Sequence, residues 1–361
     1  MTRAALHHAV LHPTLFGATL FGATLLGATL LGATLFVAGC GPTGKAYNYP
    51  LDATLRLDHL QVKGTHNSYH VEKANNDVKE WHYSHVPLDL QLDKQGVRQI
   101  ELDLHWVKDD QGDGYHFEIY HVILADDVST CPTLVECLKT VKSWSDKYPG
   151  HLPLYIQMEV KDGFIPALAE AFFTNLESDI LRVFPRSRII TPDEVRAGAA
   201  TLPDALAAGW PTLAKLRGRL FFNFDNRDET RAAYTHGLAN LDGRLAFVDS
   251  DPSDPFGAIS VLNDPIRDQV RIDAAVAAHL LVRTRADVDG DAARANDFSG
   301  WDAALASAAH YISTDFPAPV AGTSYFVEMP DGTPARCNPV SAPPSCTSLA
   351  LEDPRFVGST P

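Results

Sequence analysis

The sequence predicts an α/β fold, a (β/α)8 barrel of the TIM type built by a single domain. From Leu60 onward, short apolar runs rich in β-branched and aromatic residues alternate with longer amphipathic segments rich in Ala and Leu. This is the pattern of repeated βα units around a parallel sheet. Polar residues interrupt the pattern mainly where the short runs end. A chain of 361 residues with 45% hydrophobic residues is also long enough to bury one large core.

Eight short runs are candidate strands, and eight alternations in one domain predict a barrel, which we allow to be distorted or incompletely closed. The runs are Leu60–Lys63, Arg98–Leu104, Leu152–Val160, Arg188–Ile190, Arg219–Asn223, Arg244–Asp249, Leu280–Thr284 and Tyr311–Thr314. Amphipathic helices are predicted between several of them, at Pro166–Phe184, Ile266–Ala278 and Trp301–Ala309. The carboxyl ends of barrel strands face one common mouth, so residues distant in sequence can share a site there.

The chain after Phe316 is rich in Pro, Ser, Gly and Thr and has no helical period. We expect residues 317–361 to form an extended tail over the barrel rather than a second domain. Apart from Cys40, the five cysteines form two close pairs, Cys131 with Cys137 and Cys337 with Cys346. Each pair is predicted to form a disulfide, the second of which pins the tail. Four free thiols are the alternative, and neither spacing is that of a zinc knuckle.

The N-terminal residues 1–39 have the features of a lipoprotein-type signal peptide. Arg3 precedes an uncharged stretch from Leu15 to Gly39, and the small residues before Cys40 resemble a bacterial lipobox. In this interpretation Cys40 is lipidated and the protein is exported, as a cell-envelope lipoprotein held at a membrane by its lipid. A simple signal peptide and a retained anchor helix are the alternatives, because the stretch is long enough to span a bilayer. Residues 40–56 are then a linker, and residues 57–361 are the barrel with its tail.

The formal net charge of the chain is −15. A surface this acidic repels phosphate backbones and anionic lipid head groups at long range. Nucleic acid is therefore not an expected partner, and any phosphate that the protein handles needs a local cation.

Two carboxylates stand at the expected mouth of the barrel. Glu101 and Asp103 are two residues apart on a predicted strand, so both point to the same face while their apolar neighbours point to the other. Buried carboxylates are costly unless something neutralises them. A hard divalent cation would do so, with oxygen ligands from Glu101, Asp103, Glu159 and the Asn67 amide. Pairing of the carboxylates with Lys or Arg is the alternative that spacing leaves open.

Two histidines end apolar runs near the same mouth. His66 follows the first predicted strand after a glycine that allows a sharp turn, and His121 ends the run Glu118-Ile119-Tyr120. Two imidazoles flanking a phosphate can serve as base and acid, because their ordinary pKa of about 6.5 lets either hold or release a proton near neutrality. Six other histidines are expected to be structural or solvated, namely His70, His82, His85, His105, His116 and His151.

These residues together resemble a known family. The segments Gly64-Thr65-His66-Asn67-Ser68-Tyr69, Glu101-Leu102-Asp103, Tyr120-His121 and Glu159 occur in the order found in the catalytic X region of calcium-dependent phosphoinositide-specific phospholipases C. The likeness is closest to the secreted bacterial calcium-dependent phosphatidylinositol phospholipases C, which belong to the superfamily of phospholipase-C-like phosphodiesterases with a TIM barrel. It extends over the whole span after the leader, including residues 281–287 and 312–316.

The resemblance implies a role for each residue. Asn67, Glu101, Asp103 and Glu159 would hold Ca²⁺, and His66 and His121 would flank the phosphate. The inositol 2-hydroxyl would attack phosphorus to give a cyclic phosphodiester, with His121 protonating the diacylglycerol oxygen. His66 would act as the base or as a transition-state donor, although Glu101, Asp103 or Glu159 could be the base instead. Lys161 would contact the phosphate, as similar lysines do in the superfamily, although pairing with a carboxylate is the alternative. Arg283 and Asp315 end the last two predicted strands and face the same mouth, so they could read inositol hydroxyls.

Other interpretations remain at this point. A glycerophosphodiester phosphodiesterase or a sphingomyelinase-D-like enzyme would share the barrel and the paired histidines, but the former usually has His-Arg-Gly where this chain has His66-Asn67-Ser68. A non-catalytic lipid-binding envelope lipoprotein is a third possibility. We expect a monomer whose partner is a phospholipid at a membrane surface. The segment Asp287-Val288-Asp289-Gly290-Asp291 looks like the start of a calcium-binding EF-hand loop, but it lacks the closing glutamate and is predicted to be a solvated acidic loop.

Overall fold

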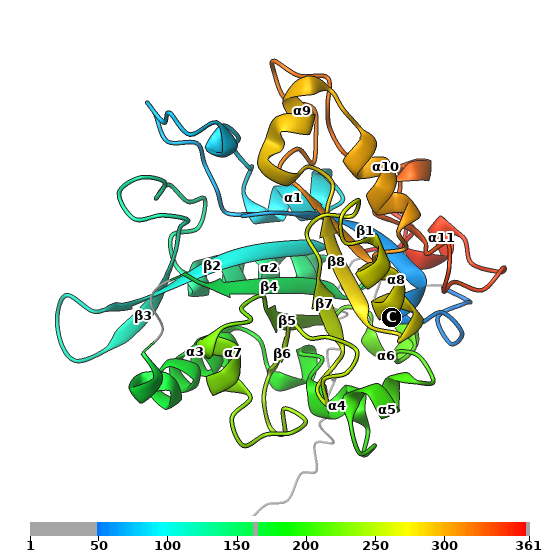
Figure 1. Ribbon diagram of the computed structural model, residues 1–361, viewed down its shortest axis with the longest axis horizontal. Coiled ribbons are helices and arrows are strands. Elements are labelled where there is room, and N and C mark those ends of the chain that lie inside the picture. The colour runs from blue at the N-terminus through cyan, green and yellow to red at the C-terminus, as the bar shows by residue number, and fades with distance from the viewer. Residues whose placement is uncertain (1–48, 162–164, 359–361) are drawn as a thin grey trace, which may run out of the picture. The chain divides into compact units, whose positions relative to one another are not determined.

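Eight parallel strands form a nearly closed barrel in the computed structural model, which describes residues 49–161 and 165–358 (Figure 1). The order around the barrel is β6-β5-β4-β2-β1-β9-β8-β7, and a single bridge between Asp249 and Ile259 joins β6 to β7. The strands are β1 (Leu60–Thr65), β2 (Gln99–Lys108), β4 (Leu154–Val160), β5 (Leu220–Phe224), β6 (Ala246–Val248), β7 (Ile259–Val261), β8 (Leu281–Arg285) and β9 (Tyr311–Thr314). The predicted fold class is confirmed.

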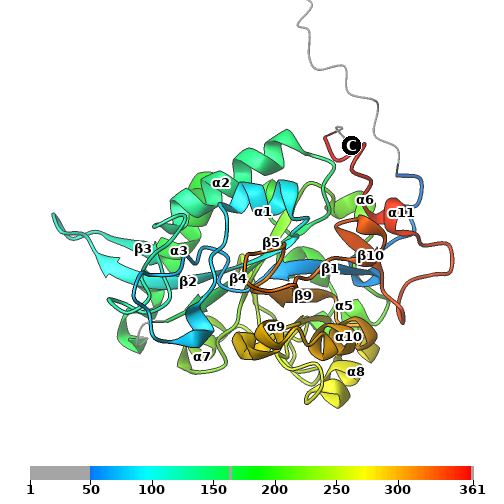
Figure 2. The same cartoon turned by 90° about the horizontal axis from the view of Figure 1, so that it is seen from above.

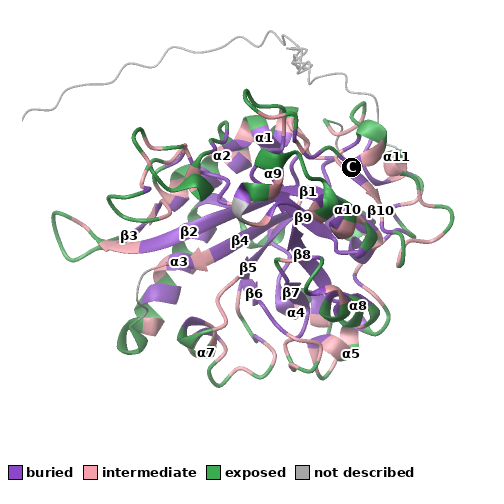
Figure 3. Ribbon diagram, turned by 45° about the horizontal axis from the view of Figure 1, so that its top comes forward, coloured by how far each residue is buried: buried purple, intermediate pink, exposed green. Residues whose placement is uncertain are grey.

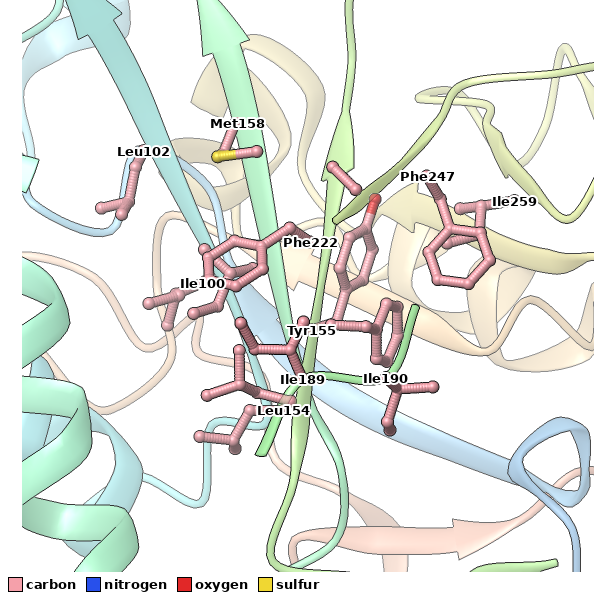
Figure 4. Close-up of a cluster of buried hydrophobic side chains, with 14 of the residues drawn as sticks. Ile100, Leu102, Leu154, Tyr155, Met158, Ile189, Ile190, Phe222, Phe247 and Ile259 are labelled. Carbon is pink, nitrogen blue, oxygen red and sulfur yellow. The ribbon is translucent and has the colours of Figure 1, made fainter. Parts of the chain in front are cut away.

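One predicted strand is wrong. Residues 188–190 do not form a strand: the chain makes a 3-10 turn at Arg186–Arg188, and only Ile189 pairs with the sheet, through a bridge to Leu220. Ile189 and Ile190 are buried at the base of the strands near Leu154 (Figure 4). The run therefore looks like a strand because it is apolar and β-branched, although it serves to fill the core. The missing strand is β7, whose three residues are too few to show a period.

Helices cover the outside of the strands (Figures 2 and 3). The predicted helices correspond to α3 (Ala169–Val183), α8 (Gln269–Ala277) and α10 (Ser299–Ala306). The others are α1 (Leu88–Lys94), α2 (Leu134–Lys147), α4 (Pro192–Arg196), α5 (Leu202–Leu206), α6 (Leu213–Leu216), α7 (Glu229–Tyr234), α9 (Asp291–Ala295) and α11 (Ser348–Leu351). Short 3-10 turns occupy Leu57–His59, Lys79–Trp81, Pro166–Leu168, Arg186–Arg188, Val288–Gly290 and Pro330–Gly332.

Helix α2 shows how local sequence fixes these elements. Thr133 precedes the helix and its hydroxyl accepts a hydrogen bond from the backbone N–H of Glu136 at 3.3 Å, so one of the free N–H groups of the first turn is satisfied. The residues that face the barrel recur every three or four positions and are buried, namely Leu134, Cys137, Leu138, Val141 and Trp144. The disulfide between Cys131 and Cys137 ties the start of the helix to the preceding loop, as predicted.

The C-terminal tail closes a seam in the barrel. Strands β1 and β2 pair only at Gly64 and Gln99, where a Cβ on Gly64 would lie 1.8 Å from the Gln99 side chain. On the same side of β1, Leu60, Gln61 and Val62 pair instead with the antiparallel strand β10 (Ala335–Cys337). The disulfide between Cys337 and Cys346 holds this part of the tail, and a buried ion pair joins Arg98 to Glu352. The tail is therefore part of the barrel wall, although the sequence predicted only a covering.

A hairpin that the sequence analysis missed extends β2 beyond the barrel (Figures 1 and 2). Strand β3 (Tyr115–Ile119) runs antiparallel to β2, with Ile119 opposite Leu104 and Tyr115 opposite Lys108. The glycines of Gly112-Asp113-Gly114 between the two strands are the turn signal that could have revealed it. Because β3 runs back along β2, it returns the chain, and with it His121, toward the mouth of the barrel.

The interior of the barrel is aromatic at its base and polar at its mouth. Tyr155, Phe221 and Tyr311 form the basal layer. The ring centroid of Tyr155 lies 5.0 Å from that of Phe221 and 4.9 Å from that of Tyr311. Two residues further along the strands, Gln157 and Asn223 follow on the same interior face. Aliphatic residues on the opposite face of these strands, including Ile100, Leu102 and Met158, pack beneath the helices (Figure 4). Side chains two residues apart on a strand share its interior face. The first such layer is aromatic and forms the base of the barrel, and the layers that follow are polar and lead to the mouth.

Two buried histidines support the fold in their neutral form. His310 accepts a hydrogen bond at Nδ1 from the Val282 N–H at 3.0 Å and donates from Nε2 to the Asp58 carbonyl at 3.1 Å. His151 lies against Ser145, with 2.6 Å between its Nε2 and the hydroxyl oxygen. Burial lowers the pKa of each histidine to about 4. The pKa in the unfolded chain is about 6.5, so acid favours unfolding.

We expect these two histidines to lower the free energy of unfolding as the pH drops from 6.5 toward 4, while buried carboxyls whose pKa is raised, such as Asp103 and Asp287, act in the opposite direction. Each histidine contributes a loss of about 3 kcal/mol over this range, because one pKa unit corresponds to about 1.4 kcal/mol. Urea titrations at several pH values will measure this slope. In His310→Asn the amide oxygen can replace Nδ1 as acceptor, but the side chain no longer titrates. The change of the free energy of unfolding with pH should therefore lose the contribution of one histidine. An unchanged slope in this variant would contradict the assignment.

The predicted signal peptide, the lipidation site Cys40 and most of the linker lie outside the described residues. Among the residues that are described, no helix has both the length and the apolar character needed to cross a membrane.

Candidate active site

The strand registers bring the predicted site residues together at the mouth. Asp103 on β2 lies opposite Glu159 on β4, and Thr65 on β1 lies opposite Thr314 on β9, which places His66 beside Asp315. Ion pairs join His66, Glu101, Arg283 and Asp315 into one group and Asp103, Glu159 and Lys161 into a second, and the two groups meet where the three carboxylates approach one another. Asn67 is buried directly after His66 and has a left-handed backbone, with φ of 41°. His121 belongs to a neighbouring network with Asp126.

Three carboxylates form the centre of the site. Glu101, Asp103 and Glu159 each offer an oxygen within 4.8 Å of the others. The Lys161 ammonium lies 3.2 Å from both Asp103 and Glu159, and the Arg283 guanidinium pairs with Glu101. The carboxylates are thus paired with basic residues, which is one of the two alternatives raised by the sequence, and they also lie close enough together to share a cation. Three carboxylates against two cations leave one formal negative charge.

The cluster has the donor set and the charge deficit that suit a divalent cation. Burial, together with the charges of Glu159 and Glu101, raises the pKa of Asp103 to about 8. Neither oxygen of Asp103 has a hydrogen-bond partner of good geometry among the described residues, and the ammonium of Lys161 is the main group that compensates its charge. Burial opposes ionisation of Glu101 as well, but Arg283 and His66 hold the pKa of Glu101 below its usual value. Oxygen ligands around a residual negative charge fit Ca²⁺.

His66 is held by a carboxylate that leaves one ring nitrogen facing the cluster. Its Nδ1 lies 2.8 Å from Asp315, whose other oxygen accepts from Arg285 at 3.1 Å. Since a carboxylate only accepts, Nδ1 carries the hydrogen and Nε2 has the lone pair, 4.0 Å from Glu101. Burial and then the Arg285 charge lower the pKa of His66, which favours the neutral ring. The side chain keeps 21% of its surface exposed, so the ring remains open to the mouth.

His121 has its own carboxylate partner. Its Nδ1 lies 2.9 Å from Asp126, and the ring of Trp81 meets it edge to face at 5.5 Å. Both oxygens of Asp126 also contact Nε2 of His70, at 2.9 and 3.0 Å. Burial works against the charged carboxylate, but the hydrogen bonds from His121 and His70 lower the pKa of Asp126 to about 2. His70 is buried and hydrogen-bonded, as expected of a structural histidine, and the carboxylate that it contacts is the partner of His121.

Several residues at the mouth escaped the sequence analysis. Asp225 follows β5, accepts a hydrogen bond from the Gln157 amide at 3.1 Å, and has its pKa raised by burial and by Glu101. Arg285 holds Asp315, and Asp126 holds His121. Asp225 and Arg285 could have been found from their position at the end of a predicted strand. Asp126 lies in a loop whose sequence has no period, so no pattern pointed to it.

The acidic segment after β8 differs from its prediction. Asp287 is fully buried. Its carboxylate accepts one hydrogen bond from the Thr314 hydroxyl and another from the Asp315 N–H at 3.1 Å. The prediction of a solvated loop is wrong for this residue, because its carboxylate fixes the end of β9. It thereby supports the segment that carries Asp315.

Comparisons with known proteins agree with this geometry. A family model described as "Phosphoinositide phospholipase C, Ca2+-dependent" matches residues 55–119 and 113–339. No curated protein matches the sequence. Two apo-form structures of a calcium-dependent phosphoinositol-specific phospholipase C from a Gram-negative Pseudomonas species, a myoinositol complex and crystal form 1, are 20% identical with TM-scores of 0.57. Each alignment covers 80% of this chain and 97% of the other.

A third structure, a Ca²⁺-dependent phosphatidylinositol-specific phospholipase C from Streptomyces antibioticus, is 18% identical. Its TM-score is 0.54, and the alignment covers 73% of this chain and 95% of the other. At such identities these structures show a shared fold. Because the family model spans the barrel from β1 to β10, the chain belongs to the family of Ca²⁺-dependent phosphoinositide phospholipases C.

Proposed function

We propose that this enzyme cleaves phosphatidylinositol-type phospholipids to diacylglycerol and a cyclic inositol phosphate, with Ca²⁺ as its cofactor. One observation carries the proposal: the cluster of Glu101, Asp103 and Glu159, of which the first two are buried, shares the mouth of the barrel with a histidine whose far nitrogen is held by Asp315. A metal-assisted attack on a phosphodiester needs a cation site and a base that faces it. Family membership supplies the reaction class.

His66 is the proposed base. Its Nε2 lone pair takes the proton from the inositol 2-hydroxyl, whose oxygen then attacks phosphorus. Asp315 holds the ring by its Nδ1–H and stabilises the imidazolium that forms. Both oxygens of Asp315 are engaged, by His66 and Arg285, so we now assign this residue to positioning His66 rather than to reading inositol hydroxyls. A carboxylate of the cluster is a weaker candidate base, since each is paired with a cation.

His121 is the proposed acid. The P–O bond to glycerol breaks with its electron pair on the glycerol oxygen, and this oxygen takes the proton from Nε2 of His121. Asn67, Glu101, Asp103 and Glu159 are the proposed ligands of Ca²⁺, which when bound lowers the pKa of the attacking hydroxyl and neutralises charge on the phosphate. Lys161 is proposed to contact the phosphate. Arg283 stays a predicted contact of the inositol. In this structure its guanidinium donates to Glu101 and Asn263.

The test is incubation of purified protein with phosphatidylinositol, glycerophosphoinositol and sphingomyelin, each with Ca²⁺ and with a chelator. Release of a cyclic inositol phosphate from phosphatidylinositol, only with Ca²⁺, is the expected result. Product from one of the other two substrates alone would favour the glycerophosphodiesterase or sphingomyelinase-D-like interpretation. Binding without any product would favour the non-catalytic lipoprotein.

We further propose that residues 1–39 direct export, that Cys40 carries a lipid that holds the enzyme at the cell envelope, and that residues 40–56 link this anchor to a monomeric barrel. The small residues before Cys40 support this proposal. Cys40→Ser is expected to move the protein from the membrane fraction to the soluble fraction. Retention of the variant in the membrane fraction would point to an uncleaved anchor helix.

The loop after His121 is proposed to contact the lipid surface. Ile123 and Leu124 expose 65% and 80% of their surface at its tip, two and three residues from His121. A neutral apolar contact suits a strongly acidic protein, which anionic head groups repel. We expect Ile123→Ser with Leu124→Ser to slow cleavage of phosphatidylinositol in vesicles about tenfold or more, since roughly 3 kcal/mol of apolar burial is lost. Cleavage of a soluble short-chain substrate should be unchanged, and equal losses on both would contradict a lipid contact.

A further inference from the structure

Asp126 and His70 form a buried support for His121 that lies outside the predicted site. The two residues are almost fully buried, with 1% or less of either side chain exposed, whereas His121 exposes 19%. His121 is therefore the accessible end of a three-residue chain whose other members are inside the protein. A carboxylate buried to this extent is costly unless its hydrogen bonds compensate it.

The backbone fixes Asp126 beside His121. The Asp126 carbonyl accepts from the N–H groups of His121 at 3.2 Å and Val122 at 2.9 Å, and the Asp126 N–H donates to Val122 at 2.7 Å. Residues 121–126 are thus closed into a tight loop, and Lys73 braces it by donating to the Leu124 carbonyl at 2.6 Å and to Asp127 at 2.7 Å. The contact between the carboxylate and Nδ1 is therefore built into the loop.

The hydrogen-bond types determine where the protons lie. A carboxylate only accepts, so His121 donates from Nδ1 and His70 donates from Nε2. The Nδ1 of His70 is buried without a hydrogen-bond partner among the described residues, and a proton there would lack an acceptor. His70 is therefore neutral, and the negative charge of Asp126 is available to His121 alone. The polar contact that His121 makes with the described part of the chain uses Nδ1, which leaves Nε2 for the substrate.

We propose that Asp126, oriented by His70, is the positioning residue of the acid His121: it holds the ring by Nδ1–H, so that the charged ring points its Nε2–H at the leaving glycerol oxygen, and it stabilises that charged ring. The inference rests on the proposed function. When the P–O bond breaks, Nε2 gives its proton to the glycerol oxygen, and His121 becomes neutral while Nδ1–H stays on Asp126. Positioning by a carboxylate matters only where the leaving group needs a proton.

The kinetic test compares two leaving groups. Asp126→Asn is expected to lower kcat for phosphatidylinositol about a hundredfold, with KM little changed. An inositol 4-nitrophenyl phosphate releases an anion that needs no proton, so its cleavage should change by less than about threefold. His70→Phe, which cannot donate to Asp126, should show a smaller loss with the same dependence on the leaving group. His70→Gln, whose amide can donate, should recover part of it. Equal losses on both substrates would overturn the proposal.

A neighbouring acid and a spectroscopic measurement complete the test. Asp127→Asn removes the charge of the neighbouring acid but keeps an oxygen that can accept from Lys73, so the loop stays braced and both substrates should be cleaved as before. Nitrogen-15 NMR of the full-length protein should show His121 with its proton on Nδ1 and His70 with its proton on Nε2, and Asp126→Asn should abolish the preference of His121. A neutral His121 protonated on Nε2 in the unaltered protein would overturn the proposal. This readout decides it even if phosphatidylinositol is not the substrate.

Discussion

Asp103→Asn is expected to reduce Ca²⁺-dependent cleavage of phosphatidylinositol about a thousandfold. Bound Ca²⁺ is expected to stabilise the transition state by several kcal/mol, and each loss of about 1.4 kcal/mol lowers the rate tenfold. Asparagine keeps the shape of Asp103 but removes one of the three clustered negative charges. The measurement is the rate as a function of Ca²⁺ concentration. A variant that retains full stimulation at the same concentrations would show that Asp103 is not a ligand.

Thermal unfolding separates metal binding from folding in this variant. Ca²⁺ at a hundred times its Kd should stabilise the unaltered protein by about 2.7 kcal/mol and should not stabilise Asp103→Asn. Without Ca²⁺, the variant should unfold at the same or a higher temperature, because burial raises the pKa of Asp103 and makes its charged form unfavourable at neutral pH. Asp110→Asn is the matched control, since Asp110 is exposed beyond the same strand. It should alter neither the rate nor the response to Ca²⁺.

His66→Asn is expected to lower kcat about a thousandfold while leaving Ca²⁺ binding intact. Asparagine can still hydrogen-bond Asp315 but offers no basic nitrogen, and a positioned base contributes roughly 10² to 10⁴ to a rate. The loss should be similar for phosphatidylinositol and for a substrate with a nitrophenyl leaving group, because attack by the hydroxyl is needed in both. Steady-state kinetics with the two substrates will measure it. This distinguishes His66 from His121, whose loss should depend on the leaving group.

The control for His66 is His116→Gln. His116 lies on β3, where its polar partners in the described part of the chain are Asp109 and Glu118, neither of which belongs to the site. The rate should not change. Activity of His66→Asn close to that of the unaltered protein would assign the base to a carboxylate of the cluster, the alternative that the sequence left open.

The barrel itself could be predicted from the sequence because its strands are buried on both faces and its helices are amphipathic. Seven of the eight predicted runs coincide with strands to within a few residues at each end. The prediction failed at 188–190 and missed β7, because a short apolar run has the same composition whether it pairs or only fills the core. The β2–β3 hairpin was missed although it contains two glycines at its turn, since the regular βα alternation suggested no antiparallel strand.

The sequence by itself determined which chemical groups are present and in which order: Glu101 and Asp103 on one face of a strand, Glu159 ending another, and histidines at the ends of two apolar runs. Their positions follow from side-chain periods that are local. The tertiary structure alone decided the pairing of Asp103 with Lys161, of His66 with Asp315 and of His121 with Asp126. Two of these contacts depend on strand register, and the third on the closure of a loop. Register and loop closure arise from packing across the whole barrel, which no local pattern in the sequence encodes.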